Sequence, residues 1–482
     1  MTIAWILLWA SCTEPEYIDK VNGGSDSAGQ VDDSGEDTNV QNPTESSMFE
    51  SAAVCGECHV RQYEEWRGSM HAYAALSPVF DAMALKAHRD TSGEVGTFCT
   101  GCHSPLGTLE GESGSTVAAE RSALSREGVT CDVCHTAVSH VVPVGNTGLV
   151  LDEAGPKQGP YASDGVEGHL SAENSFSTSP ELCGSCHDVF NFPGLYIEEA
   201  YTEYLDSPAR ANGDRCQDCH MGTEPGVPGP RPMGPSAEGA VLEYPDREMT
   251  SHKFVGPDYS LLDDFPYPDD LNASAIAQEE YAGEVLTLLQ NAVEISSVQV
   301  HTQGSFHEVR VQVRNKTTGH NVPTGFTSER QLWLEVIATG QSGTVYYQSG
   351  DLDSYGDLRD SHSWDVKSGS VELDANLFNL QSSNLHRFGI QDEALPGSSG
   401  TPLELTETIF PFDADFIYKR SLAPGEVRLV SYLFAGVSEP VEVSVRLRYR
   451  NLPPYILRAL QLDDLVPRLR IFTIDTDQAS IQ

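Results

Sequence analysis

Alternating apolar and polar positions mark the second half of the chain as β-structure. Segments 309–313 and 441–449 alternate regularly, which is the pattern of strands with one buried face. Segment 332–337 is apolar at most positions and indicates a more deeply buried strand. We therefore expect a β-sandwich domain over residues 293–482, with a loop-rich insertion at about 350–415.

The region before these strands shows no long periodic run. Residues 51–270 contain short helix candidates, such as 60–66 and 196–205, between stretches rich in Gly and Pro. A helical pattern follows at 271–292 and would connect the two halves. The pattern predicts a multidomain protein, with a mainly α and irregular domain at 51–270 followed by an all-β sandwich-like domain.

The N-terminal segment has the composition of an export signal and a tether. Residues 1–12 contain an apolar run too short to cross a bilayer and end in Trp-Ala-Ser-Cys at Cys12. This resembles a lipoprotein signal in which Cys12 is lipidated, although Trp9 stands where Leu is usual and no Lys or Arg precedes the run. Residues 13–50 are acidic and nearly free of apolar side chains, which predicts a disordered tether. We expect an exported protein held to a membrane by lipid.

The chain is strongly acidic. Its 71 Asp and Glu against 29 Lys and Arg give a formal net charge of -42. Nucleic acid and anionic membrane surfaces would be repelled. A basic or metal-bearing redox partner protein would be attracted, although salt limits that attraction to short range. The solubility of an exported protein is an alternative explanation of the acidity.

Five copies of Cys-x-x-Cys-His carry the candidate chemistry. Their cysteines are Cys55, Cys58, Cys99, Cys102, Cys131, Cys134, Cys183, Cys186, Cys216 and Cys219, and the histidines behind them are His59, His103, His135, His187 and His220. In this signature the thiols form thioethers with a porphyrin, and the imidazole binds the iron as proximal ligand. Paired Cys-x-x-Cys zinc sites are the alternative, but they require no histidine there, and only 15 of 482 residues are histidine. The motifs predict five covalently bound haem c groups.

The histidines outside the motifs decide whether each iron is closed. An iron with a second axial imidazole only passes electrons, whereas an open position allows chemistry. Five further histidines fall in residues 51–270 and match the motifs in number: His71, His88, His140, His169 and His252. His320, in the Gly- and Pro-rich loop 318–325, is a sixth candidate that would fix the C-terminal domain to a haem. Surface exposure is the alternative for each of them.

Longer sequences around the motifs carry a family resemblance. They lie at 55–71, 181–188, 201–221, 251–254 and 319–325, and span roughly residues 51–330. The chain resembles the multihaem cytochromes c of the cytochrome c-554 and hydroxylamine-oxidoreductase-like class. The resemblance implies closely stacked, mostly bis-histidine haems that conduct electrons in the periplasm or at the outer membrane. It supports His71, His169 and His252 as distal ligands without telling which haem each serves.

The expected function is electron transfer along the haems, with potentials set by axial ligands, burial and nearby acidic groups. One alternative is a reductase or oxidase of a small nitrogen or sulfur compound with one open haem. Pentahaem nitrite reductases typically carry a Cys-x-x-Cys-Lys motif, and all five motifs here end in histidine, which counts against that alternative. The other alternative is a docking subunit whose C-terminal domain assembles an extracellular redox complex. The expected location is the periplasm or the outer surface of a Gram-negative-type bacterium.

Overall fold

The computed structural model describes residues 48–162, 168–192, 194–239, 246–388 and 404–482. The expected signal segment with Cys12, and the expected tether up to residue 47, lie outside them. The described residues belong to one compact unit, and its division into domains at the expected boundaries stays a prediction. Among the described residues, no helix has the length and apolar character needed to cross a bilayer.

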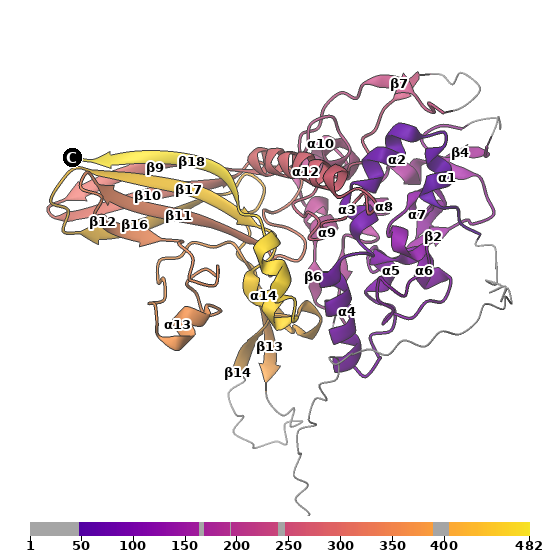
Figure 1. Cartoon of the computed structure of the whole chain (residues 1–482). Helices are drawn as coiled ribbons and strands as arrows, with labels where there is room; N and C mark the ends of the chain where they lie inside the picture. Colours follow the sequence, from indigo (N-terminus) through magenta and orange to yellow (C-terminus); the bar gives the residue numbers. More distant parts are fainter. Residues whose placement is uncertain (1–47, 163–167, 193, 240–245, 389–403) are drawn as a thin grey trace, which may run out of the picture. The chain divides into compact units, whose positions relative to one another are not determined.

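Short helices and loops build the first part of this unit, as the sequence predicts (Figure 1). The helix expected at 60–66 is α2, Val60–Arg67. The longest described helix here is α4, Pro78–Asp90, which begins where the Ser77 hydroxyl accepts a hydrogen bond from the Phe80 backbone N–H. The other helices are α1 (Ala52–Gly56), α3 (Met70–Tyr73), α5 (Thr100–His103), α6 (Pro105–Leu109), α7 (Cys131–His135), α8 (Pro180–Gly184), α9 (Ala200–Leu205), α10 (Pro208–Asn212) and α11 (Cys216–His220). Short paired strands lie between them: β1 (Ala137–His140) with β2 (Leu149–Leu151), β3 (Lys157–Gly159) with β4 (Ser171–Glu173), and β7 (Met233–Pro235) with β8 (Asp246–Glu248).

The prediction of a helix at 196–205 is wrong for the first half of that segment. Tyr196–Glu198 is strand β6, which pairs antiparallel with β5, Val189–Phe190, and only Ala200–Leu205 is helical. Ile197 is buried in this hairpin, so tertiary packing overrides the local helical pattern. This hairpin places Glu198.

A long helix joins the two parts. It is α12, Leu271–Ala292, where a helix is expected at 271–292. The Asp270 carboxylate caps it by accepting hydrogen bonds from two backbone N–H groups of the first turn. Val285 and Leu289 point into a core that they share with the strands that follow. The helix is therefore packed against the β-structure.

Two antiparallel sheets form the second part, in agreement with the expected all-β fold. One sheet has the order β16-β10-β9, with β9 Val293–Gln303, β10 Phe306–Asn315 and β16 Val427–Ala435. The other has the order β12-β11-β17-β18, with β11 Gln331–Gly340, β12 Val345–Ser349, β17 Val441–Arg450 and β18 Phe472–Ile481. The inward residues of β10, β11 and β17 belong to one buried cluster, which is the packing of a sandwich.

The expected insertion between β12 and β16 carries its own small elements. They are α13 (Trp364–Ser368) and a sheet of β13 (Ser383–Phe388), β14 (Glu404–Thr408) and β15 (Phe416–Tyr418). Helix α14, Pro454–Ala459, follows β17. The loop-rich character expected at about 350–415 is confirmed for the described residues of that range.

The two parts share buried contacts. Val79 of α4, with Tyr259 and Leu261, belongs to the same core cluster as the strands. The Arg330 guanidinium donates two hydrogen bonds to the Asp258 carboxylate, at 2.8 and 3.0 Å, and such paired geometry is the strong form of an ion pair. The sandwich is thus held against the helical part by a shared core and by an ion pair.

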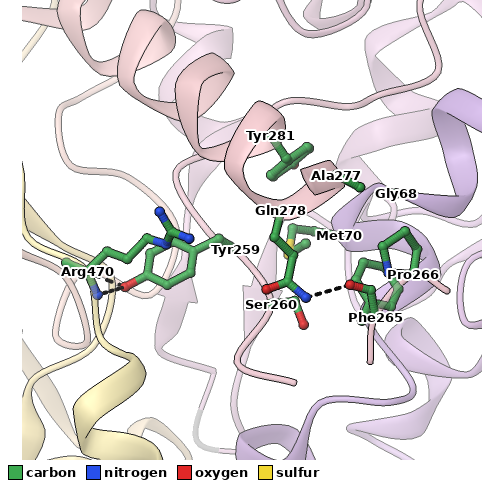
Figure 2. Close-up of a pocket in the computed structure, with 10 residues that line it drawn as sticks. All are labelled: Gly68, Met70, Tyr259, Ser260, Phe265, Pro266, Ala277, Gln278, Tyr281 and Arg470. Atoms are coloured by element: carbon green, nitrogen blue, oxygen red, sulfur yellow. Dashed lines mark hydrogen bonds between the residues drawn. The ribbon is translucent and has the colours of Figure 1, made fainter. Parts of the chain in front are cut away.

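A small cavity lies at this junction (Figure 2). Its walls include Met70 of α3, Gln278 of α12 and Arg470. The Tyr259 hydroxyl accepts a hydrogen bond from the Arg470 backbone N–H at 2.6 Å, and the Gln278 amide donates to the Phe265 carbonyl at 2.5 Å. The cavity volume of about 20 Å³ holds about one water molecule. It is too small for a substrate site.

Candidate functional site

Each Cys-x-x-Cys-His motif folds as one helical turn. The backbone N–H of His59 donates to the Cys55 carbonyl at 2.8 Å, and that of His187 donates to the Cys183 carbonyl at 2.9 Å. Residues three and four positions apart lie on the same face of such a turn. The two thiols and the imidazole of a motif therefore point to one side, where a single porphyrin can bind all three.

The Nδ1 atoms of the motif histidines are held by oxygen atoms. Four of them lie near backbone carbonyls: His59 with Ser236 at 2.8 Å, His103 with Ala74 at 3.3 Å, His135 with Gln158 at 2.7 Å and His220 with Val255 at 2.9 Å. Because a carbonyl only accepts, Nδ1 must carry the proton, and Nε2 keeps its lone pair. Nε2 is therefore available to a metal, with the ring orientation fixed from behind.

His187 is held differently from the other four. Its Nδ1 lies 3.1 Å from the Glu198 carboxylate, which stands at the end of β6. Burial lowers the pKa of His187, but the hydrogen bond and charge of Glu198 outweigh that effect and raise it to about 9. Sequence reasoning missed Glu198, because it lies in the segment expected to be helical and nothing in its neighbours marks it.

Three motif histidines face a second histidine at nearly the same distance. The ring centroids are 6.1 Å apart for His59 and His169, 6.3 Å for His187 and His71, and 6.1 Å for His220 and His320. A metal–imidazole bond of about 2 Å, with about 1.2 Å from each nitrogen to its ring centre, separates two rings on one metal by about 6.4 Å. The donor pairs therefore fit a bis-imidazole iron.

A fourth pair is indicated by electrostatics. Burial lowers the pKa of His252 to about 4, and among the neighbouring charges His135 contributes most to this shift. The His252 Nδ1 donates to the Thr250 carbonyl at 2.9 Å, and its backbone N–H donates to Glu65 at 2.8 Å. His252 is thus held near the third motif with Nε2 available.

The neutral state of these buried histidines, in the motifs and outside them, suits metal binding. Burial lowers the pKa of His71 to about 3, with a further contribution from His187. Burial, together with His320, lowers the pKa of His220 to about 4. Imidazole binds a metal in its neutral form, so these side chains are ready for coordination at physiological pH.

His103 has a different environment. Its ring stacks on Phe80, with centroids 4.1 Å apart and 6° between the planes. The buried Arg121 guanidinium lies over the Phe80 ring at 5.3 Å and donates to Asp81 at 2.8 Å. All fifteen histidines are among the described residues, and within them no imidazole is in ring contact with His103.

Neither His88 nor His140 is in ring contact with a motif histidine among the described residues. His140 packs on Phe176 with centroids 5.8 Å apart, and its Nδ1 donates to the Val141 carbonyl at 2.8 Å. His88 stands in the last turn of α4, where its side chain covers Gly93. Their expected role as distal ligands has no geometric support among the described contacts.

The loop that carries His320 is fastened to α9. Glu203 accepts hydrogen bonds from the Asn321 backbone N–H at 3.1 Å, the Asn321 amide at 2.7 Å and the Thr324 hydroxyl at 2.7 Å. The backbone N–H of Ala209 donates to the Thr318 carbonyl at 2.9 Å. Glu203 and Ala209 of the helical part, both within the sequence 201–221 that carries the family resemblance, thus hold a loop of the sandwich beside the fifth motif.

The motif turns form a connected series. Cys131 lies against Cys55, Cys186 against Cys102 and Cys183 against Cys216. Cys134 also interacts with both Cys183 and Cys186. The fourth motif therefore borders the second, third and fifth motifs, and the first motif borders the third.

The chain is similar to known cytochromes in sequence and in fold. Residues 54–136 match the family model described as cytochrome c554 and c-prime. The structure is similar to a penta-haem cytochrome c552 from Thermochromatium tepidum, with a TM-score of 0.55 and 18% identity, over 90% of this chain and 99% of that chain. Identity this low shows the fold alone. No curated protein matches the chain. The family match over residues 54–136, the shared fold and the geometry of the motif turns together support a multihaem c-type cytochrome that binds haem c covalently.

Proposed function

We propose that the chain is an exported five-haem cytochrome that transfers electrons through mostly bis-histidine haems. The observation that carries this proposal is the set of His–His pairs at 6.1 to 6.3 Å. Haem c supplies a one-electron couple when bound, and an iron closed on both sides passes electrons without binding a substrate. The protein's part is to attach the groups, fix the imidazoles and exclude water.

The axial ligand assignments follow from the pairs. His169 serves the motif of His59, His71 that of His187, and His320 that of His220. His252 serves the motif of His135. These four assignments use three of the five non-motif histidines expected from residues 51–270, together with the sandwich histidine His320.

The contacts between cysteines of different motifs indicate the order in which electrons would pass between the haems. The first, third, fourth and fifth motifs form one series, and the second joins it at the fourth, through Cys102 and Cys186. Donor and acceptor would dock at the two ends of that series. The net charge of -42 favours a partner with a basic docking face.

A second function is favoured by the environment of His103. Among the described residues Phe80, and no imidazole, is in ring contact with His103, so its iron would keep one axial position open. An open haem reduces or oxidises small molecules, so a nitrogen or sulfur compound is the substrate class for this alternative. The alternative concerns the second motif alone and leaves the other four haems as conduits.

Spectroscopy of the purified protein tests both functions. We expect five haems per polypeptide by the pyridine haemochrome assay, four low-spin ferric signals by electron paramagnetic resonance, and carbon monoxide bound to one reduced iron. Fewer than five haems, or two or more high-spin irons, would overturn the five-haem conduit. Steady turnover of nitrite or hydroxylamine would establish the second function.

A double variant assigns the open position. Cys99→Ser with Cys102→Ser removes the attachment of the second haem, and we expect four low-spin haems and no binding of carbon monoxide. The matched control, Cys131→Ser with Cys134→Ser, should remove a low-spin signal and keep carbon monoxide binding. Retention of that binding in the first variant would refute the assignment to His103.

Export and lipid anchoring belong to the same proposal. Thioether attachment of haem takes place outside the cytoplasm, and the multihaem class is typically periplasmic. Lipidation of Cys12 would hold the protein at a membrane by its acidic N-terminal segment. A Cys12→Ser variant should pass from the detergent phase to the aqueous phase in Triton X-114 partition while its haem spectrum stays unchanged. An unchanged partition would exclude the anchor.

A further inference from the structure

The second coordination shell differs among the five motifs at one place. His187 faces a carboxylate through Nδ1, at 3.1 Å from Glu198, whereas the other four motif histidines face backbone carbonyls. A hydrogen bond to an ionised acceptor is roughly twice as strong as one to a neutral acceptor. As the carboxylate draws the Nδ1 proton, Nε2 becomes a stronger donor to a metal. The sequence of the fourth motif shows no such difference, because Glu198 comes from another strand.

The carboxylate reaches His187 through backbone pairing. Val189, two residues after His187, pairs with Glu198 across the β5–β6 hairpin. Glu198 is only 9% exposed. Asp188, which separates His187 from Val189 in the sequence, is fixed to α9. Its carboxylate accepts hydrogen bonds from the Thr202 backbone N–H at 3.1 Å and the Thr202 hydroxyl at 2.7 Å. The approach of Glu198 to His187 is therefore set by the fold and does not depend on a flexible side chain.

Arg330, a cation close to Glu198, is already engaged. A Cβ on Gly325 would lie 3.3 Å from the Arg330 guanidinium and 3.8 Å from the Glu198 carboxylate, so both groups lie close to this glycine. Arg330 donates its two terminal nitrogens to Asp258 and its Nε to the Thr324 carbonyl. Its charge is largely compensated by Asp258, which leaves the Glu198 carboxylate to act on His187.

The fourth motif is also the junction of the series. Its cysteines lie against Cys102 of the second motif and Cys216 of the fifth, and interact with Cys134 of the third. A change in the potential of this one site alters transfer in every direction, while a change at an end alters only one step.

We propose that Glu198 is a positioning residue that lowers the reduction potential of the iron held by His187 and makes the fourth motif a low-potential junction. Greater electron donation from the imidazole stabilises the ferric state relative to the ferrous state. Electrons that reach the junction then pass on readily towards the second and fifth motifs. This inference rests on the proposed haem set and deepens the proposed electron transfer.

The test is a spectroelectrochemical titration of the whole protein with Glu198→Gln. Glutamine keeps the size of the side chain and removes the charge. We expect one of the five components to shift towards reduction by at least tenfold in its equilibrium constant, which is about 59 mV for one electron. The other four components should move much less.

Glu181→Gln is the matched control. Glu181 stands in the first turn of α8, which carries Cys183, and its carboxylate accepts from the Tyr201 hydroxyl at 3.3 Å without contacting His187. The Glu181→Gln substitution therefore removes one carboxylate charge near the fourth motif, as Glu198→Gln does. A shift of equal size in this control, or five unmoved components in Glu198→Gln, would overturn the proposal.

The wild-type protein gives an independent readout if the variant does not take up haem. The pairs His59–His169 and His187–His71 have almost equal interplanar angles, 37° and 38°. Without Glu198 they would give nearly coincident low-spin ferric signals by electron paramagnetic resonance. We expect two distinct signals, and coincident signals would refute the role of Glu198. Failure of the proposed electron transfer would show separately, as a haem count below five or as haems that do not exchange electrons.

Discussion

The imidazole of His320 faces that of His220, with 6.1 Å between the ring centroids and 15° between the planes. His220 belongs to the fifth motif and His320 to a loop between strands β10 and β11. The sandwich thus reaches into the candidate electron path with a side chain of its own. The predictions below follow from this relationship and from its neighbours.

Removing the sandwich histidine should open one iron. In His320→Ala, we expect one low-spin ferric signal to be replaced by a high-spin signal, because an iron without its second imidazole is no longer six-coordinate. Electron paramagnetic resonance and binding of carbon monoxide measure the change. His301→Ala, on the exposed part of β9, is the control and should keep the wild-type spectrum. An unchanged spectrum in His320→Ala would remove His320 from the ligand set.

The non-motif histidines of the helical part should separate into two groups. His252→Ala is expected to convert one low-spin iron to high-spin, because His252 is buried beside the third motif. His88→Ala and His140→Ala should leave all low-spin signals in place, because their rings lie away from the motif histidines. The same spectra decide the matter, and a high-spin signal in His140→Ala would contradict the assignments.

The hydrogen bonds of Glu203 with the His320 loop should contribute measurably to the thermal stability of the protein. Glu203→Gln replaces one of the two carboxylate oxygens that accept from Asn321 and Thr324 by an amide donor. Loss of such a partner in a part-buried site costs about 1–3 kcal/mol. We expect a lower Tm of the haem-loaded protein, and low-spin absorption at the fifth motif lost before global unfolding. Glu294→Gln, whose ion pairs at 3.7 and 4.0 Å are long, should change Tm by much less.

Glu329 should make stability depend on pH. Burial raises its pKa to about 7, with Arg330 opposing the shift. The folded state then keeps a proton that the unfolded state loses above about pH 4.5, so this residue's contribution falls as pH rises from about 4.5 to 7, by up to about 3 kcal/mol. Glu329→Gln should therefore raise Tm at pH 8 and have little effect near pH 4.5. An equal gain at both pH values would contradict the buried titration.

Local signatures in the sequence predicted the parts of this site that are local in the chain. The Cys-x-x-Cys-His turns need only five consecutive residues, and the alternating segments of β10 and β17 need only their own pattern. The proposed distal ligands are different, because His71 meets His187 only after the intervening chain has folded. Counting histidines gave five for five motifs, yet that agreement included His88 and His140 and set His320 apart as a sixth candidate. No local pattern separates these three.

Residues that contact a motif histidine could not be predicted from the sequence either, because they also come from distant parts of the chain. Glu198 reaches His187 by strand pairing inside a segment with a helical pattern. Phe80 stacks on His103 from α4, and nothing near it in the sequence links it to the second motif. Such contacts depend on tertiary packing, which overrides local propensity.

The position of His320 has a consequence for the maturation of the protein. Its loop leads into β11, which pairs with β17, and β17 pairs with β18 at the C-terminal end of the described chain. In the proposed exported cytochrome, the fifth motif would be synthesised and translocated well before these strands. If His320 closes the iron of the fifth motif as proposed, that iron would gain its second imidazole only after the sandwich has formed. Its low-spin signal would then report complete assembly, and a truncated or misassembled chain would show a reactive haem.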